Sequence, residues 1–476
     1  MLFTSLEFLF LFLPITLGVY FILRRELRNA WLLAASLLFY AWGEPTFVLV
    51  MMASIAVNYV VALFVNHGDG PAGVRCKVAL GIGIVANLGL IGVYKYANFL
   101  TGVARFVFPS LQGVIPQTSI LLPIGISFFT FQAMSYLLDV YRGVPAQKNP
   151  INLALYIALF PQLIAGPIVR YNTVAEQICR RVVTADKFAD GVHRFLIGFN
   201  KKMLLANLFA STADMMFAEK SLSVCSAWLG ALCYTFQIFF DFGGYSDMAI
   251  GLGKMFGFEF LENFNYPYVS RSITEFWRRW HISLGTWFRD YLYFPLGGSR
   301  VESRFRLVFN LSVVWLATGI WHGANWTFIL WGCLYGVLII FEKLFDVPGR
   351  IERSGRLGWA MWAPTFIFVV LGWVLFRSAD MASAVKYLGM MFGVNAAGFV
   401  DGKFVFEFGE LRVLLVTAIM ASIPWIRVLR EKMEARYGGL YGCLCLAGRL
   451  VQIPLFIVGV SYLAMNAHNP FIYFNF

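Results

Sequence analysis

The sequence predicts an all-α, polytopic transmembrane helical bundle on the basis of its composition, its hydropathy and the length of its apolar runs. Of the 476 residues, 59% are hydrophobic and 13% are charged. A soluble domain carries about 25% charged residues, so this chain has roughly half the charged surface it would need in water. Its mean hydropathy is +0.69, and its apolar runs lack the alternating polar positions of an outer-membrane barrel.

About ten to twelve membrane segments are expected, some of them tilted or re-entrant. A membrane-spanning helix needs about 20 apolar residues. Apolar windows lie near 3–23, 31–43 running into 46–65, 78–97, 119–139, 151–168, 191–216, 226–250, 307–321, 325–345, 358–377, 411–427 and 441–465. Several are short or contain proline. Since no long-period repeat is visible, residues 1–476 are expected to form a single transmembrane domain.

Two polar stretches interrupt this pattern, near residues 170–202 and 271–306. Each carries seven Lys or Arg residues against three acids. The second is also rich in aromatic residues, a mixture typical of short amphipathic helices in the headgroup plane. The positive-inside rule places both stretches on the cytoplasmic side. The net charge of +12 therefore indicates loops at a membrane surface rather than nucleic-acid binding.

His322 is the first candidate for catalysis. It lies in an apolar run without formally charged side chains, where an ionisable group is costly and suggests a function. Burial would keep its ring neutral and able to accept a proton. Gly319 and Gly323 leave room for a group close to the backbone. If the helix continues, Asn325 shares a face with His322; the alternative is a histidine that a neighbouring helix satisfies.

His281 is the second candidate, 41 residues before His322. It lies in the basic, aromatic stretch, together with the acids Glu275 and Asp290. A loop and a returning helix can bring the two histidines together. The alternative is an interfacial histidine beside tryptophans, in a segment that only anchors the protein to lipid.

A pair of carboxylates forms a third cluster, in the run from Asp241 to Asp247. Paired carboxylates can act as acid and base, but a spacing of six residues is poor for one helical face. Helix capping, or pairing with Arg278 or Arg279, is the expected role.

The absence of other motifs narrows the chemistry. The sequence has no P-loop, no G-x-S-x-G elbow and no H-E-x-x-H motif, and the spacing of its cysteines predicts no metal site. A neutral histidine in a membrane pocket suits direct acyl transfer from a thioester. Such an enzyme must hold two substrates together, remove a hydroxyl proton and stabilise an oxyanion. The residues alone leave a transporter as the alternative.

Several blocks of the sequence are recognisable. They are LFLFLPITLGVYF (9–21), LLPIGISFFTFQAMSYLLDVYRG (121–143), LFPQLIAGPIVR (159–170), DFGGYSDMAIGLGKMFGFEFLENFNYPYVSRSITEFWRRWHISLGTWFRDYLYFPLGGSR (241–300), WHGANWTFILWG (321–332), GWVLFRS (372–378) and FIYF (471–474). In these blocks the chain resembles the membrane-bound O-acyltransferase (MBOAT) family, most closely its bacterial alginate O-acetylase-like branch.

This resemblance implies tilted and broken helices around a buried tunnel, and O-acyltransferase activity. It makes His322 the catalytic general base and His281 a second polar residue of the reaction chamber. The expected supporting residues are Asn325, Asp241, Trp321 and Tyr245.

The resemblance also implies substrates, partners and a location. Acetyl-CoA in the cytoplasm would be the donor, and the acetyl group would pass toward hydroxyls of an exported polysaccharide such as alginate, cellulose or another exopolysaccharide. Periplasmic acetyltransferase proteins are the expected partners, and the bacterial inner membrane the expected location. The alternatives are a polytopic transporter or flippase, or an inactive scaffold of a polysaccharide secretion complex.

Four arginines are candidates for the cytoplasmic entrance of coenzyme A, where guanidinium groups would meet phosphates. They are Arg271, Arg278, Arg279 and Arg289.

Overall fold

The computed structural model describes residues 1–68, 70, 72–111, 113–436, 438–465, 469 and 472. All regular elements within these residues are helical, which confirms the predicted all-α class. Contacts group the chain into two compact units, Met1–Val192 with Ala249–Leu261, and His193–Met248 with Glu262–Phe476. The expectation of a single domain stays a prediction.

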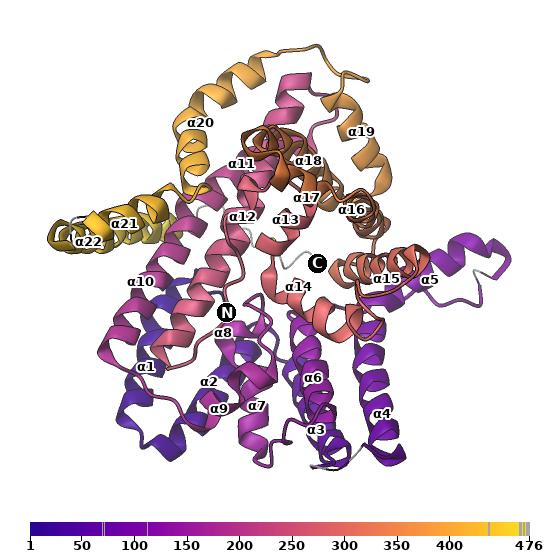
Figure 1. Cartoon of the computed structure of the whole chain (residues 1–476), viewed down its shortest axis with the longest axis vertical. Coiled ribbons are helices and arrows are strands. Elements are labelled where there is room, and N and C mark those ends of the chain that lie inside the picture. The colour runs from indigo at the N-terminus through magenta and orange to yellow at the C-terminus, as the bar shows by residue number, and fades with distance from the viewer. Residues whose placement is uncertain are drawn as a thin grey trace. The chain divides into compact units, whose positions relative to one another are not determined.

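The first unit is built from short and medium helices. Those wholly within it are α1 (Leu13–Ile22), α2 (Arg25–Gly43), α3 (Phe47–Val65), α4 (Val74–Ile91), α5 (Ala97–Val107), α6 (Ile126–Tyr141), α7 (Pro150–Ala158), α8 (Phe160–Leu163) and α9 (Tyr171–Cys179). Helical turns also occur at η1 (Phe8–Phe12), η2 (Gly92–Tyr96) and η3 (Pro109–Leu111). Helices α3, α4 and α6 pack against one another, and α2 packs against α7 (Figure 1).

Two helices, α10 (Ala185–Lys201) and α12 (Val224–Met255), contribute residues to both units. The second unit otherwise contains α11 (Asn207–Ala218), α13 (Ile273–Arg279), α14 (Ile282–Phe288), α15 (Arg304–His322), α16 (Trp326–Leu344), α17 (Val347–Arg353), α18 (Trp362–Arg377), α19 (Met381–Met391), α20 (Gly402–Ala421), α21 (Trp425–Arg436) and α22 (Gly438–Ala464). Its shorter turns are η4 (Lys202–Ala206), η5 (Pro267–Val269), η6 (Arg289–Tyr293) and η7 (Gly355–Met361).

Six helices of the described chain are long and apolar enough to cross a membrane. They are Phe47–Val65, Val74–Val107, Val224–Met255, Trp326–Leu344, Gly355–Arg377 and Leu446–Ala464. Other apolar windows form shorter helices. The window at 151–168, for example, breaks at Leu159 into α7 and α8. The protein is therefore a multi-pass membrane protein.

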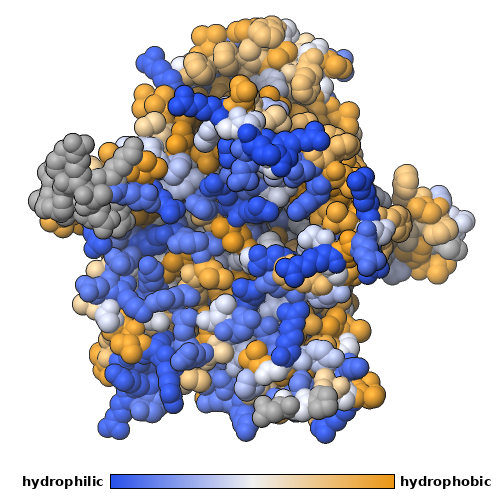
Figure 2. Space-filling model, in the orientation of Figure 1, coloured by the Kyte–Doolittle hydropathy of each residue, from blue (hydrophilic) through white to orange (hydrophobic). Residues whose placement is uncertain are grey.

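Large apolar side chains are exposed along these helices. On α4, Val78, Ile82 and Val85 are all more than half exposed. Figure 2 shows hydrophobic side chains at the molecular surface beside hydrophilic ones. Lipid would cover such residues in a bilayer, whereas a soluble monomer rarely exposes so many.

Helices α15 and α16 approach each other closely through glycines. A Cβ atom added to Gly319 would lie 2.6 Å from the carbonyl oxygen of Phe328, and one added to Gly332 would lie 2.6 Å from that of Trp315. The sequence predicted that Gly319 leaves space close to the backbone, and helix α16 occupies this space. Since His322 is the last residue of α15, this contact fixes where His322 lies.

Candidate active site

The first part of the site is the segment around α13, whose N-terminus is held by two side chains. Ser272 caps the helix by accepting a hydrogen bond from the backbone N–H of Glu275, at 3.0 Å. Glu342 of α16 accepts hydrogen bonds from the backbone N–H groups of Ile273 and Thr274, at 2.7 and 2.8 Å. A carboxylate at a helix N-terminus satisfies unpaired N–H groups and the helix dipole. These contacts anchor α13 on α16.

His281 lies between α13 and α14 in a left-handed backbone conformation, with φ 45° and ψ 52°. Non-glycine residues rarely adopt this conformation. The side chain is buried, its Nδ1 lies 3.1 Å from Oδ1 of Asn263, and its ring meets the ring of Phe242 edge-on at a centroid distance of 4.7 Å. Burial lowers the pKa of His281 to about 3, so the imidazole is neutral at physiological pH.

His322 ends α15 and is surrounded by aromatic rings. It is 4% exposed. The ring centroids of Trp321, Trp331 and Phe376 lie 4.9, 4.9 and 5.2 Å from that of the imidazole, all close to perpendicular to it. The buried position that was predicted for His322 is therefore confirmed, within a box formed by α15, α16 and α18.

The structure brings the two predicted histidines into one cluster through Trp321. The indole of Trp321 contacts the ring of His322 and also lies 6.0 Å, between centroids, from the ring of His281. The two imidazoles thus share one aromatic neighbour. Trp321 is itself buried.

The expectation that Asn325 shares a helical face with His322 is wrong, because α15 ends at His322 and α16 begins at Trp326. Asn325 instead caps α16, where its Oδ1 accepts a hydrogen bond from the N–H of Thr327 at 3.2 Å. Its Nδ2 donates to the carbonyl oxygen of Ala379, at 2.7 Å. These contacts hold the turn after His322.

Asp241 of α12 forms a buried ion pair. Its Oδ1 lies 2.7 Å from Nζ of Lys202, and its Oδ2 accepts a hydrogen bond from the backbone N–H of Ile472 at 2.9 Å. Of the FIYF motif, only Ile472 lies within the described residues. Tyr245, one turn further along α12, is also buried.

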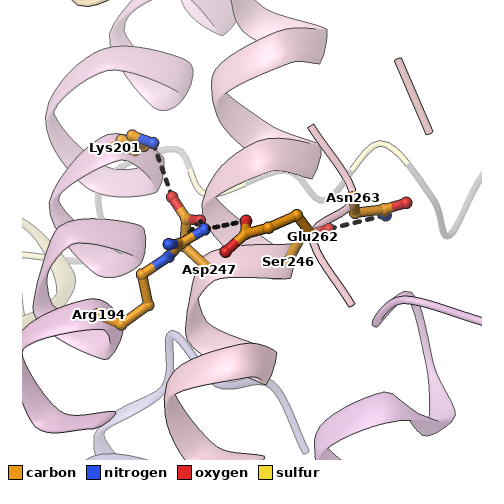
Figure 3. A network of polar contacts seen from close by, with 6 residues as sticks. All are labelled: Arg194, Lys201, Ser246, Asp247, Glu262 and Asn263. Carbon is orange, nitrogen blue, oxygen red and sulfur yellow. Dashed lines mark hydrogen bonds and ion pairs between the residues drawn. The ribbon is translucent and has the colours of Figure 1, made fainter. Parts of the chain in front are cut away.

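Asp247 is the centre of a second set of ion pairs (Figure 3). Its oxygens lie 2.6 Å from Arg194 and 2.7 Å from Lys201, and Arg194 also reaches Glu262 at 2.6 Å. Burial opposes the charge on Arg194, but the two carboxylates outweigh it and raise its pKa.

The expected pairing of this carboxylate cluster with Arg278 or Arg279 is wrong. The cations that pair with Asp241 and Asp247 come from α10 and η4.

A cavity of about 540 Å³ lies beside His281 and is lined by residues of α13, α14, α15 and α16, and by Arg289 at the start of η6. This size is typical of small-molecule sites. Its lining includes Trp277, Trp315 and the guanidinium-bearing residues Arg278 and Arg289.

The four predicted arginines therefore fall into two groups. Arg278 and Arg289 line the cavity, and Arg289 also pairs with Asp290 at 2.8 Å. Arg279 forms an ion pair with Glu275 at 2.9 Å, and the guanidinium of Arg271 lies over the ring of Trp359, 5.1 Å from its centroid. Arg279 and Arg271 thus have local partners outside the cavity lining.

Comparison with known proteins identifies the family. A model of the MBOAT (membrane-bound O-acyltransferase) family matches residues 138–385, a range that includes both histidines. The chain belongs to the membrane-bound O-acyltransferase family. This MBOAT protein is therefore an O-acyltransferase, as the sequence predicted.

Relatives cover the whole length of the chain. A Pseudomonas aeruginosa protein named "Probable alginate O-acetylase AlgI" is 48% identical, with 100% of both chains covered. A Pseudomonas putida protein of the same name is 41% identical, again over 100% of both chains. A "Peptidoglycan O-acetyltransferase" of Helicobacter pylori is 34% identical, with 100% of this chain and 98% of the relative covered.

Several residues around the site of this MBOAT protein did not emerge from sequence reasoning. Asn263, Ser283 and Glu342 make the hydrogen bonds that shape the His281 segment. The polar run around Asn263, just before Pro267, was the one available signal. Trp331 and Phe376 resemble any apolar residue of a membrane helix, so no local pattern distinguishes them.

Proposed function

We propose that this MBOAT protein transfers acetyl groups from cytoplasmic acetyl-CoA toward hydroxyls of an exported polysaccharide, in the bacterial inner membrane. The names of its full-length relatives support this choice, since they refer to O-acetylation of alginate and of peptidoglycan. The higher identity to the proteins named for alginate favours an exopolysaccharide acceptor.

The observation that carries the proposal is the pair of buried imidazoles against Trp321. In the proposed reaction, His322 takes the proton from the acceptor hydroxyl as its oxygen attacks the thioester carbonyl. The tetrahedral intermediate collapses as the C–S bond breaks, and the thiolate leaves with the electron pair. The proton on His322 then passes to the thiolate, which gives free coenzyme A and an acetyl ester.

The aromatic box suits this role of His322 by its rigidity. Three bulky rings hold the imidazole in one place, and proton transfer requires heavy atoms within about 3 Å of each other. The box also keeps water away from the thioester, which would otherwise be hydrolysed.

The cavity beside His281 is the proposed site of the coenzyme A moiety. Arg278 and Arg289 line it together with Trp277. Guanidinium groups bind phosphates through charge-assisted hydrogen bonds, and an indole offers an apolar surface. On the far side of the membrane, periplasmic acetyltransferase proteins are the proposed recipients of the acetyl group.

The test is His322→Ala, with His67→Ala as the matched control. His67 follows α3 and contacts the carbonyl oxygens of Gly70 and Tyr141. Purified variants in liposomes receive radiolabelled acetyl-CoA, and polymer acetylation is measured in a deletion strain that carries each variant. Loss of a general base lowers the rate by roughly 10²–10⁴-fold, so His322→Ala should lose both activities while His67→Ala keeps them.

Two results would contradict the proposal. In the first, His322→Ala reaches the membrane at normal levels and acetylates the polymer fully. In the second, the purified protein releases no coenzyme A with any acceptor but moves a solute across liposomes, as a transporter or flippase would.

A further inference from the structure

The amide oxygen of Asn263 is the meeting point of three buried groups. Oδ1 lies 3.1 Å from Nδ1 of His281, 3.2 Å from the backbone nitrogen of Ser283 and 2.9 Å from its Oγ. Asn263 is fully buried, and His281 and Ser283 are each 1% exposed. In such surroundings a polar contact has a defined donor and a defined acceptor.

The orientation of this amide follows from the backbone. The N–H of Ser283 can only donate, so the side-chain atom that faces it must be the oxygen. The other end of the amide agrees, because Nδ2 of Asn263 donates to Oγ of Ser246 at 3.1 Å. Oγ of Ser283 also lies 3.5 Å from Nδ1 of His281, but it donates its proton to the amide oxygen at the shorter distance of 2.9 Å. Nδ1 of His281 therefore faces an acceptor.

A neutral imidazole carries its proton on one nitrogen only. We propose that Asn263 is a positioning residue that fixes His281 in the tautomer with the proton on Nδ1, so that Nε2 offers a lone pair. This inference rests on the proposed function for the role of that lone pair. A bare Nε2 accepts a hydrogen bond but does not donate one to an oxyanion. Since the reacting hydroxyl gives its proton to His322, the donor to Nε2 is a neighbouring hydroxyl of the acceptor sugar, which assigns His281 to the hydroxyl substrate.

The backbone around His281 is adapted to this contact. The N–H of Ile282 donates to the carbonyl oxygen of Asn263 at 2.9 Å, and the N–H of Asn265 donates to that of Arg279 at 2.9 Å. The left-handed conformation of His281 is rare for a residue other than glycine. It turns the chain between α13 and α14 so that both His281 and Ser283 face the same amide oxygen.

Ion pairs hold the segment that carries Asn263. Figure 3 shows Ser246 and Asp247 side by side on α12, with Glu262 and Asn263 side by side on the facing segment. Arg194 bridges Asp247 and Glu262, at 2.6 Å from each. The polar network thus fixes the residue before Asn263 while Ser246 fixes its amide.

The test is nitrogen NMR of the full-length protein, labelled with ¹⁵N-histidine and reconstituted in lipid. The His281 signals are assigned by their loss in His281→Gln. The two ring nitrogens resonate at different shifts when protonated and when bare, so the spectrum reports the tautomer without reference to activity. We expect a protonated Nδ1 and a bare Nε2 at neutral pH.

Three variants separate positioning from folding. Asn263→Leu removes the acceptor, and the Nδ1–H tautomer should be lost or mixed with the other. Asn263→Asp keeps an acceptor oxygen, and Nδ1 should stay protonated. Asn265→Leu is the matched control, since Asn265 is exposed and its contact to Arg279 runs through the backbone; its spectrum should match the wild type.

The inference is overturned if the wild type carries its proton on Nε2, or if Asn263→Leu leaves the His281 signals unchanged. Activity then tests the proposed function separately. Asn263→Leu could change the tautomer while acetyl transfer continues at the wild-type kcat. That result would support positioning by Asn263 and would contradict a role of His281 in acyl transfer. A lower kcat with unchanged donor KM supports both.

Discussion

Nζ of Lys202 lies 2.7 Å from Oδ1 of Asp241, and the two side chains are 3% and 2% exposed. They join η4 to the long helix α12. A charge in such a place is tolerated because the opposite charge compensates it. The pair therefore behaves as a unit, and the loss of one member leaves the other as an uncompensated buried charge.

Replacement of one member should be more harmful than replacement of both. Asp241→Ala or Lys202→Ala should lower stability by about 3–5 kcal/mol. The double variant Asp241→Leu with Lys202→Met should lose less stability than either single variant, because no charge stays buried. It still loses the acceptor of the Ile472 N–H. Melting temperatures of the purified variants in detergent rank their stabilities. If the single and double variants lost the same amount of stability, the two charges would not compensate each other.

The close approach of α15 and α16 predicts opposite effects for two similar substitutions. Gly319→Ala places a Cβ 2.6 Å from a backbone oxygen, and such overpacking costs about 1–3 kcal/mol. Gly409→Ala on α20 meets nothing within 4 Å, and should stabilise by about 0.4–1 kcal/mol through the unfolded chain. Melting temperatures check the signs, and acetylation by Gly319→Ala should fall, since His322 ends α15. A melting temperature for Gly319→Ala at or above that of Gly409→Ala would contradict this geometry.

The sequence predicted the fold class and the burial of His322, because both follow from local hydropathy. It did not predict the break after His322, although Gly323 and Asn325 are residue types that often follow and precede helices, respectively. The uncharged run continues across them, and hydropathy alone therefore favoured a continuous helix. The caps at Ser272 and Asn325 depend on where each helix begins, which apolar windows locate only roughly.

Contacts between residues that lie far apart in the sequence were harder to predict. Lys202 and Asp241 lie 39 residues apart, and the expected partners of Asp241 were arginines in a different segment. A charge pattern shows which groups need partners but does not show which helices are neighbours. The meeting of His281 and His322 at Trp321 is of the same kind: the sequence raised it as an expectation, and only tertiary structure could decide it.

The burial of His281 predicts a pH dependence of stability with a definite sign. Burial lowers its pKa from 6.5 to about 3. Above pH 6.5 the ring is neutral in the folded and the unfolded chain. As the pH falls from 6.5 toward 3, only the unfolded chain binds this proton, so stability is lost.

His281→Gln should remove the part of the pH dependence of stability that the protonation of His281 causes. Its melting temperature should fall less steeply than that of the wild type as the pH decreases below 6.5, and the two curves should run parallel above it. His67→Ala, a variant of the histidine that follows α3, serves as the control. Curves for His281→Gln and wild type that stay parallel down to pH 4 would show that His281 titrates as a solvated histidine.

The cavity arginines predict a selective effect on the donor. Charge-assisted hydrogen bonds contribute about 1.5–3 kcal/mol each, so Arg278→Gln or Arg289→Gln should raise the KM for acetyl-CoA roughly tenfold to a hundredfold. The kcat should change little, because neither guanidinium is assigned to the reacting atoms.

Arg353→Gln is the matched control for these variants. Arg353 is an exposed arginine of α17 that pairs with Asp346 at 2.7 Å, so its loss changes the net charge equally without touching the cavity. Steady-state kinetics at two salt concentrations separate direct contacts in the cavity from attraction by the overall surface charge. Salt screens the attraction between exposed charges over about 10 Å. A KM that rises equally in all three variants would mean that general surface charge, rather than the cavity, attracts the donor.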